Sequence, residues 1–151
     1  MRRTTLLVLT TIFSFLGIAD AWYLAEHALT NTALYCTIGS ISGCNTVAQS
    51  PYSHFFGIPL GVYGVVFYGL VFVAAAFAFT HHARRLMQFL FFLGCVGLLF
   101  SLYFMALQLF VIDALCIYCL GSFVLAVLIF ITTAFLVRRR PTAPPVLEPA
   151  S

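Results

Sequence analysis

The fold is decided by the stretch LMQFLFFLGCVGLLFSLYFMALQLFVIDALCIYCLGSFVLAVLIFITTAFLV, which runs from Leu86 to Val137. Asp113 is its single charged residue. As one helix the stretch would be about 78 Å long at 1.5 Å per residue, whereas about 20 helical residues are enough to cross a bilayer. We therefore expect a turn near Val111–Ala114 that divides the stretch into two membrane-spanning helices, Leu86–Phe110 and Leu115–Val137.

Two more apolar stretches, Thr4–Leu24 and Gly57–Phe79, are long enough to span a membrane. The chain has 151 residues, of which 63% are hydrophobic and 7% charged, against about 25% charged in a soluble domain. We predict an all-α integral membrane four-helix bundle over residues 1–140, with a long loop, Ala25–Phe56, between the first two helices. The short proline-rich tail 141–151 is expected to be disordered.

The basic residues predict the orientation. Each lies at the border of an apolar stretch, and the loop Ala25–Phe56 contains none of them. Under the positive-inside rule, both termini are cytoplasmic and this loop is extracytoplasmic, at the cell membrane. Basic residues at membrane borders do not form a nucleic-acid-binding patch, so no such partner is expected. The basic residues are Arg2, Arg3, Arg84, Arg85, Arg138, Arg139 and Arg140.

The start of the chain also resembles a secretory signal with an A-x-A site at Ala19–Ala21. Cleavage there would leave the later segments on the same faces of the membrane.

Two pairs of cysteines are expected on the extracytoplasmic face. Cys36 and Cys44 lie in the long loop, and Cys116 and Cys119 form a C-x-x-C at the head of the last apolar stretch. Residues three apart share a helix face with Cβ atoms about 5–6 Å apart, so a small tightening of the turn permits a disulfide. A helix N-terminus also stabilises a thiolate and lowers its pKa. The two dithiols therefore favour an electron relay by thiol–disulfide exchange.

Other interpretations of the same residues stay open. The pairs could be structural disulfides in a non-enzymatic four-span protein whose loop binds a partner, or the four thiolates could bind Zn²⁺, although the loop spacing is wide for a zinc knuckle. Ser50 could hydrogen-bond a thiolate or a reactant's oxygen, but its place as the turn residue before Pro51 is the simpler explanation. Phe123 lies on the helix face of Cys119, where it either walls a quinone-like reactant or fills the bundle surface.

Four motifs follow one another in chain order. They are Cys36-x7-Cys44, Val47-Ala48-Gln49-Ser50-Pro51-Tyr52, Phe56-Gly57-Ile58-Pro59 and Leu115-Cys116-Ile117-Tyr118-Cys119. Their order, their spacing and the four predicted spans resemble the vitamin K epoxide reductase family in its bacterial or archaeal form, over essentially Thr4 to Val137. The DsbB-like proteins, which also couple thiols to quinones, carry their C-x-x-C in the first outer loop instead.

The resemblance implies that Cys116 and Cys119 are the active-site couple, with Cys119 nearest a membrane quinone of the ubiquinone or menaquinone type. It implies that Cys36 and Cys44 carry electrons from a reduced thioredoxin-like (DsbA-like) partner, so that the enzyme supports disulfide bond formation. Ser50 falls on a position that the family keeps as serine.

Two departures from the family pattern bear on function. Many bacterial relatives carry a fused thioredoxin-like domain, whereas the segment after Arg140 is too short for one, so the partner is expected in trans. Vertebrate members use a tyrosine where this chain has Phe123, and an asparagine in the second span that this chain lacks. The missing tyrosine and asparagine put reduction of an epoxide in doubt.

Overall fold

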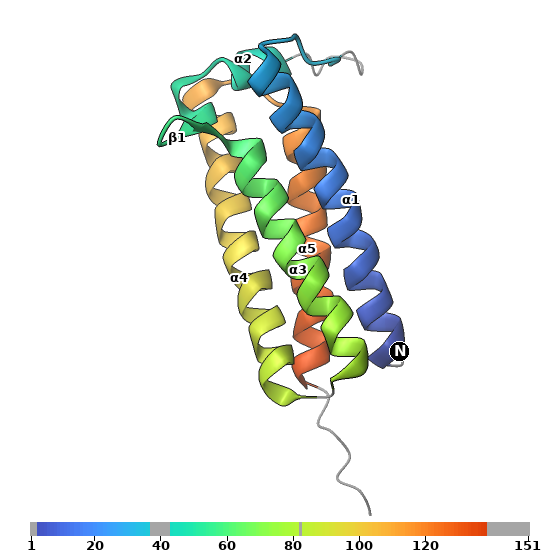
Figure 1. Ribbon diagram of the computed structural model, residues 1–151. Helices are drawn as coiled ribbons and strands as arrows, with labels where there is room; N and C mark the ends of the chain where they lie inside the picture. The colour runs from blue at the N-terminus through green and yellow to red at the C-terminus, as the bar shows by residue number, and fades with distance from the viewer. Residues whose placement is uncertain (1–2, 37–42, 82, 139–151) are drawn as a thin grey trace, which may run out of the picture.

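The computed structural model describes residues 3–36, 43–81 and 83–138 of the chain. Most of them lie in four long helical segments that run up and down in one bundle (Figure 1). The segments are α1 (Arg3–Thr30), α3 (Leu60–Thr80), α4 (Arg84–Leu107) with its π-helical continuation η2 (Gln108–Ile112), and α5 (Ile117–Arg138). Each is long and apolar enough to cross a membrane. The prediction of an all-α four-helix membrane bundle is confirmed, while the tail 141–151 and the loop residues 37–42 lie outside the described residues.

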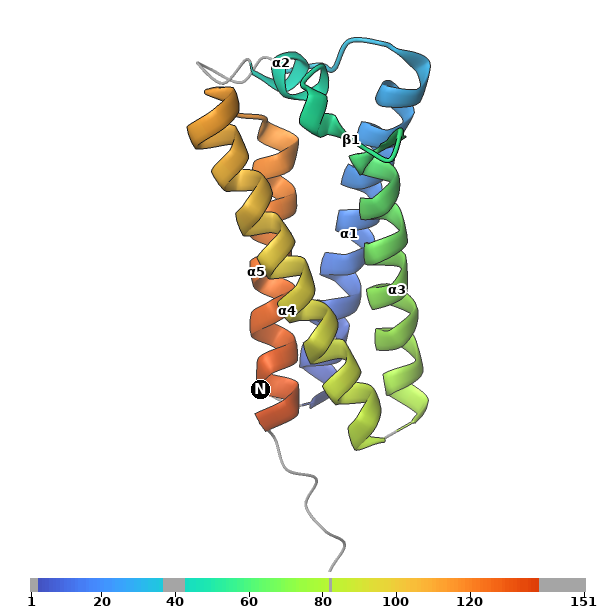
Figure 2. The same cartoon turned by 90° about the vertical axis from the view of Figure 1, so that its left-hand side faces the viewer.

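Short elements close one end of the bundle. They are α2 (Cys44–Ala48), the 3-10 turn η1 (Pro51–Ser53) and an antiparallel hairpin of β1 (His54–Phe55) and β2 (Ile58–Pro59). Figure 2 shows them at the end of the bundle where α1 ends and α5 begins. The described arginines lie at the opposite end, where α1 and α4 begin and α5 ends.

The helices that flank this cap differ in length from the predicted ones. α1 continues past Leu24 to Thr30, whose hydroxyl donates to the carbonyl of Glu26 at 2.8 Å. The predicted end of the first helix is therefore too early, because the polar stretch after Leu24 extends the helix instead of leaving it. α3 begins at Leu60 and not at Gly57, since Gly57 has a φ of 78° and belongs to the hairpin turn.

The expected turn between the last two spans is present at residues 113–116. Asp113 adopts a left-handed conformation with a φ of 54°, which aspartate tolerates better than most residues. The N–H of Ala114 donates back to the carbonyl of Gln108 at 3.2 Å and closes the π-helical turn. The chain thus reverses at its charged residue, and α5 starts immediately after Cys116.

In the helix packing, α1 lies between α3 and α5, and α5 lies between α1 and α4. α1 contacts both α3 and α5, while α4 packs mainly on α5 and approaches α3 much less. Gly17 of α1 lies so close to the Tyr68 ring of α3 that any side chain at position 17 would overlap it. Between α1 and α5, the hydroxyl of Thr10 donates to Thr132 at 3.0 Å, so a buried polar pair fixes their register.

A cysteine cluster as the candidate active site

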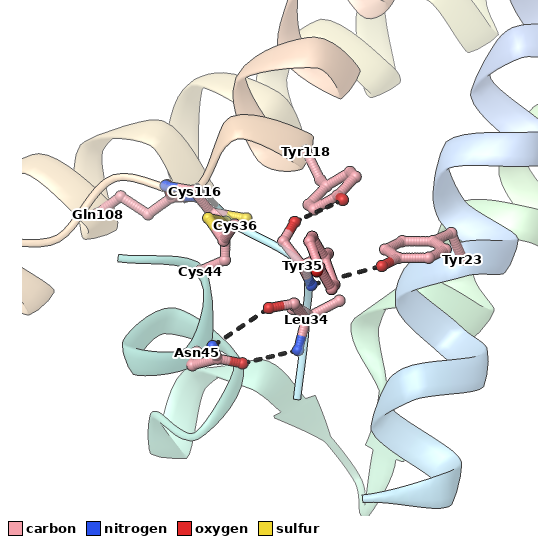
Figure 3. The surroundings of a disulfide bond; sticks show 9 residues. All are labelled: Tyr23, Leu34, Tyr35, Cys36, Cys44, Asn45, Gln108, Cys116 and Tyr118. Carbon is pink, nitrogen blue, oxygen red and sulfur yellow. Dashed lines mark hydrogen bonds between the residues drawn. A yellow bond between two sulfur atoms is a disulfide. The ribbon is translucent and has the colours of Figure 1, made fainter. Parts of the chain in front are cut away.

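All four cysteines that the sequence singles out lie in one cluster. Cys36 follows α1, Cys44 begins α2, and Cys116 and Cys119 lie at the head of α5. A disulfide joins Cys36 to Cys44, with their Cα atoms 6.0 Å apart, and Figure 3 shows it beside Cys116. Cys44 and Cys116 are 0% and 1% exposed. The fold therefore brings the loop pair against the C-x-x-C pair and shields the contact from solvent.

Side chains from three helices hold the segment that leads to the disulfide (Figure 3). Asn45 of α2 accepts from the N–H of Leu34 at 2.8 Å and donates to its carbonyl at 3.3 Å. Tyr118 of α5 donates to the carbonyl of Tyr35 at 2.8 Å, and the N–H of Tyr35 donates to Tyr23 of α1 at 3.5 Å. The backbone of the two residues before the first loop cysteine is thus held by side chains of α2, α5 and α1.

A glycine sets the distance between the two cysteine pairs. A Cβ atom at Gly43 would lie 2.8 Å from the carbonyl oxygen of Leu115 and 2.9 Å from the Cβ of Ala114. Real Cβ atoms essentially never approach that closely. The missing side chain at Gly43 therefore lets Cys44 lie directly on the turn that precedes Cys116.

The inner pair sits at the start of a helix, as the sequence predicts. Cys116 is the N-terminal flanking residue of α5, because its carbonyl accepts from the N–H of Leu120 at 3.0 Å. Its own N–H donates to Oε1 of Gln108 at 3.0 Å. Gln108 is 3% exposed, and its side chain also hydrogen-bonds the Cys119 thiol. One buried amide from the π-helical turn thus orients both ends of the C-x-x-C.

The two inner thiols are reduced and hydrogen-bonded to each other. This bond from Cys119 is the main cause that lowers the pKa of the Cys116 thiol from 9.0 to about 7, while burial acts in the opposite direction. The backbone N–H groups of Cys119 and Tyr118 lower it further, and the charge of Asp20 slightly offsets them. Cys116 is therefore a thiolate for a large part of the time near neutral pH, which is the nucleophilic form.

Two other predicted site residues lie at the border of this cluster. The Ser50 hydroxyl donates to the carbonyl of Val47 at 2.7 Å, so its proton closes its own turn before η1. Phe123 is half-buried on α5, one helical turn beyond Cys119. Their roles at the site stay predictions. No group of three or more metal-ligating side chains is arranged for a metal ion within the described residues.

Sequence reasoning missed the polar residues that support the cysteines. Gln108 and Asp20 are rare polar side chains within apolar helices, and such residues commonly mark functional sites. The sequence shows that both residues are polar within apolar helices, but it does not indicate which neighbouring side chain each one faces. Asn45 and Tyr118 could not have been found in this way, because polar residues are ordinary at a membrane surface.

The comparisons with known proteins agree with this site. No curated protein matches the chain significantly. A family model does match, over residues 8–134, which include all four clustered cysteines and most of the chain. Four apolar spans and a buried thiol cluster describe a multi-pass membrane thiol oxidoreductase. The chain belongs to the vitamin K epoxide reductase family.

Proposed function

We propose that the protein relays electrons from a reduced thioredoxin-like protein to a membrane quinone and thereby supports disulfide bond formation. Cys36 and Cys44 exchange with the partner, and Cys116 and Cys119 form the couple that meets the quinone. In this proposal Ser50 hydrogen-bonds a thiolate or an oxygen of the reactant, and Phe123 borders the quinone. The partner is a separate, DsbA-like protein.

One observation carries the proposal, namely the contact between the Cys36–Cys44 disulfide and the Cys116 thiol. Thiol–disulfide exchange requires a thiolate to reach a disulfide sulfur, and a thiol of lower pKa leaves the attacked bond faster. The pKa of about 7 at Cys116 therefore favours release of its thiolate when the loop disulfide re-forms. A disulfide that only clipped a loop would not need a thiolate beside it.

The oxidation states in the structure correspond to one stage of the relay. The loop pair is oxidised and the inner pair is reduced, which is the state after electrons have moved inward. Before it, a partner thiolate attacks the loop disulfide, and its second thiol resolves the mixed disulfide. The reduced loop pair then attacks the Cys116–Cys119 disulfide, which restores the Cys36–Cys44 bond and leaves two inner thiols. Each exchange breaks one S–S bond and forms one, so two electrons and two protons move together.

The last step oxidises the inner pair at the quinone. Cys119 is half-buried and lies farther along α5 than Cys116, where an apolar reactant can approach from the bilayer. Closure of the Cys116–Cys119 bond releases two electrons and two protons, which convert a quinone to a quinol. Because 30 mV corresponds to about 1.4 kcal/mol for a two-electron couple, a modest potential gap drives this step.

The proposal places the cysteine cluster on the extracytoplasmic side and both termini in the cytoplasm. The described arginines and the cysteine cluster lie at opposite ends of the bundle. This separation supports the orientation, because arginines are enriched on the cytoplasmic side of a membrane. A membrane-impermeant thiol reagent, applied to intact cells after reduction, should label the cluster. Labelling that requires broken cells would reverse the orientation.

The relay is tested by reconstitution into lipid bilayers with a quinone and a reduced thioredoxin-like protein. Quinone reduction is followed by absorbance, and partner oxidation is followed by gel shift after thiol alkylation. The Cys119→Ala variant should lose quinone reduction, whereas Cys95→Ala, altered in the middle of α4, should retain it. Quinone reduction by Cys119→Ala at the native rate would show that the assignment is wrong. A loop disulfide that never forms a mixed disulfide with the partner would instead indicate that the Cys36–Cys44 bond is purely structural.

A further inference from the structure

Asp20 lies on the face of α1 that is turned toward the cysteine cluster. Gly17, one turn before it, contacts Tyr68 of α3. Tyr23, one turn after it, packs on Tyr118 of α5 with ring centroids 4.9 Å apart. Residues three apart share a helix face, so the Asp20 side chain projects between α3 and α5. At 1.5 Å per residue, it lies about 4.5 Å deeper along α1 than the tyrosine that borders the cluster.

The Asp20 carboxyl has one oxygen that is buried and makes no hydrogen bond to any described residue. The other described acidic side chains, Glu26 and Asp113, are exposed. A buried carboxyl that lacks a partner costs stability, and an ionisable side chain within a membrane span is expensive. Packing alone does not account for Asp20, because an apolar residue of similar volume would avoid this cost.

Asp20 lies within electrostatic reach of Cys116, because its charge raises the pKa of that thiol, as the smallest of the effects on it. Its charge also reaches the hydroxyl of Tyr68 in α3. Tyr68 in turn donates to the carbonyl of Ser122, which lies one turn beyond Cys119, and its oxygen is 2.7 Å from the Ser122 hydroxyl. The carboxyl therefore lies in the same buried layer as the inner dithiol.

Two other proton-carrying groups of this layer, from α3 and α5, are already engaged. Tyr68 is bound to Ser122, and Tyr118 donates to the backbone of the loop. The two thiols are the groups that lose protons in the reaction. Asp20 is a further titratable group there, and its buried oxygen makes no hydrogen bond to a described residue, so it can accept and return a proton.

We propose that Asp20 carries one proton from the inner dithiol to the quinone, and this rests on the proposed function. As the Cys116–Cys119 bond forms, two S–H bonds break and the electron pair passes to the quinone. Asp20 accepts one of the two protons and delivers it to one quinone oxygen, while the second thiol proton goes to the other oxygen. Two O–H bonds form, and Asp20 ends the turnover in the form in which it began.

The test compares Asp20→Asn, which keeps the shape but cannot transfer a proton, with Asp20→Glu, which keeps the carboxyl. Glu26→Gln, on the exposed side of the same helix, is the matched control. Each protein is reduced and mixed rapidly with quinone in a bilayer. Loss of a positioned acid–base group typically slows a reaction about 10²–10⁴-fold, so we expect quinone reduction to slow by about 100-fold or more in Asp20→Asn. Asp20→Glu should retain a substantial part of the rate, and Glu26→Gln should equal the native protein.

Two readouts separate a proton role from a merely structural one. Exchange between the loop disulfide and Cys116, measured as a trapped mixed disulfide in a Cys119→Ser background, should be unchanged in Asp20→Asn. The pH profile of quinone reduction should lose one titration in Asp20→Asn and keep it in Asp20→Glu. The native protein, Asp20→Asn and Asp20→Glu share the titratable groups that face Asp20, so these groups cannot cause a difference between the pH profiles. They are Tyr23 from α1, Tyr68 from α3, and Cys116, Tyr118 and Cys119 from the start of α5.

A small substitute acid provides a third readout. In an Asp20→Gly variant, added acetate or formate should restore part of the rate of quinone reduction, whereas chloride should not. Native protein that does not reduce quinone would defeat the proposed function itself. Native protein that does so, together with an equally fast and equally pH-dependent Asp20→Asn variant, would overturn the role of Asp20 alone.

Discussion

The N–H of Cys116 donates to Oε1 of Gln108 at 3.0 Å, across the turn that separates the last two membrane spans. Gln108 belongs to the π-helical turn at the end of α4, and such turns occur frequently at functional sites. The turn directs this amide inward, where it satisfies a buried donor and also reaches the Cys119 thiol. The reversal of the chain and the position of the active cysteines are therefore fixed by the same side chain.

Replacing Gln108 with leucine should destabilise the protein. The change keeps the volume but leaves the buried N–H of Cys116 without an acceptor, which costs about 1–3 kcal/mol. Unfolding in detergent should show this loss in Gln108→Leu. Gln88→Leu, which alters an exposed glutamine of the same helix, is the control and should change stability little. Equal stabilities of the two variants would mean that the Gln108 bond contributes nothing.

The reactivity of Cys116 should titrate near neutral pH. Because its pKa is lowered to about 7, the thiolate fraction should rise as the pH passes upward through about 7 and fall below it. The main cause is the hydrogen bond from Cys119, so Cys119→Ala should move the midpoint back toward 9.0. Cys119→Ser keeps a donor and should preserve part of the shift. Thiolate absorbance in the ultraviolet, recorded against pH with the loop disulfide intact and Cys95 replaced by alanine, measures each midpoint.

The spans and the turn near Asp113 could be predicted because they depend on length and polarity alone. A run of apolar residues from Leu86 to Val137 cannot form one transmembrane helix, so the position of the break follows from the single charge within it. The cysteines could be assigned to one end of the bundle for the same reason. Helix ends in the polar cap were less predictable, since membrane thickness does not limit α1 beyond Leu24.

The contacts within the cap could not be predicted from the sequence. Asn45 binds Leu34 across a segment that shows no periodic pattern, and Gly43 is one of several glycines near the loop cysteines. Which glycine faces the turn before Cys116 depends on the path of the whole loop. The same holds for Asp20, because its charge could be read in the sequence but its orientation between α3 and α5 requires the packing of three helices.

Gly43→Ala should slow the transfer of electrons between the two cysteine pairs. The added methyl group would lie within 2.9 Å of Leu115 and Ala114, so the loop must move away from Cys116. Overpacking of this kind costs about 1–3 kcal/mol, and about 1.4 kcal/mol in the exchange step is a tenfold slower rate. Reduction of the inner disulfide by the partner, followed by alkylation, measures the step. Gly69→Ala is the control, since a Cβ atom there meets nothing within 4 Å; a normal rate in Gly43→Ala would show that the close approach is not required.

Asn45→Ala should make the loop disulfide easier to reduce from outside. The change removes both hydrogen bonds that Asn45 makes to Leu34, and the bonds of Tyr35 to Tyr23 and Tyr118 remain. Each lost bond is worth about 0.5–1.5 kcal/mol, so local opening and the rate of reduction by a soluble thiol should rise about tenfold. Asn45→Asp, which keeps the acceptor for the Leu34 N–H, should show a smaller increase, and the exposed Thr46→Ala change should show none. If Asn45→Ala is reduced no faster than Thr46→Ala, the disulfide is protected by its burial against Cys116 and not by the hydrogen bonds of the preceding segment.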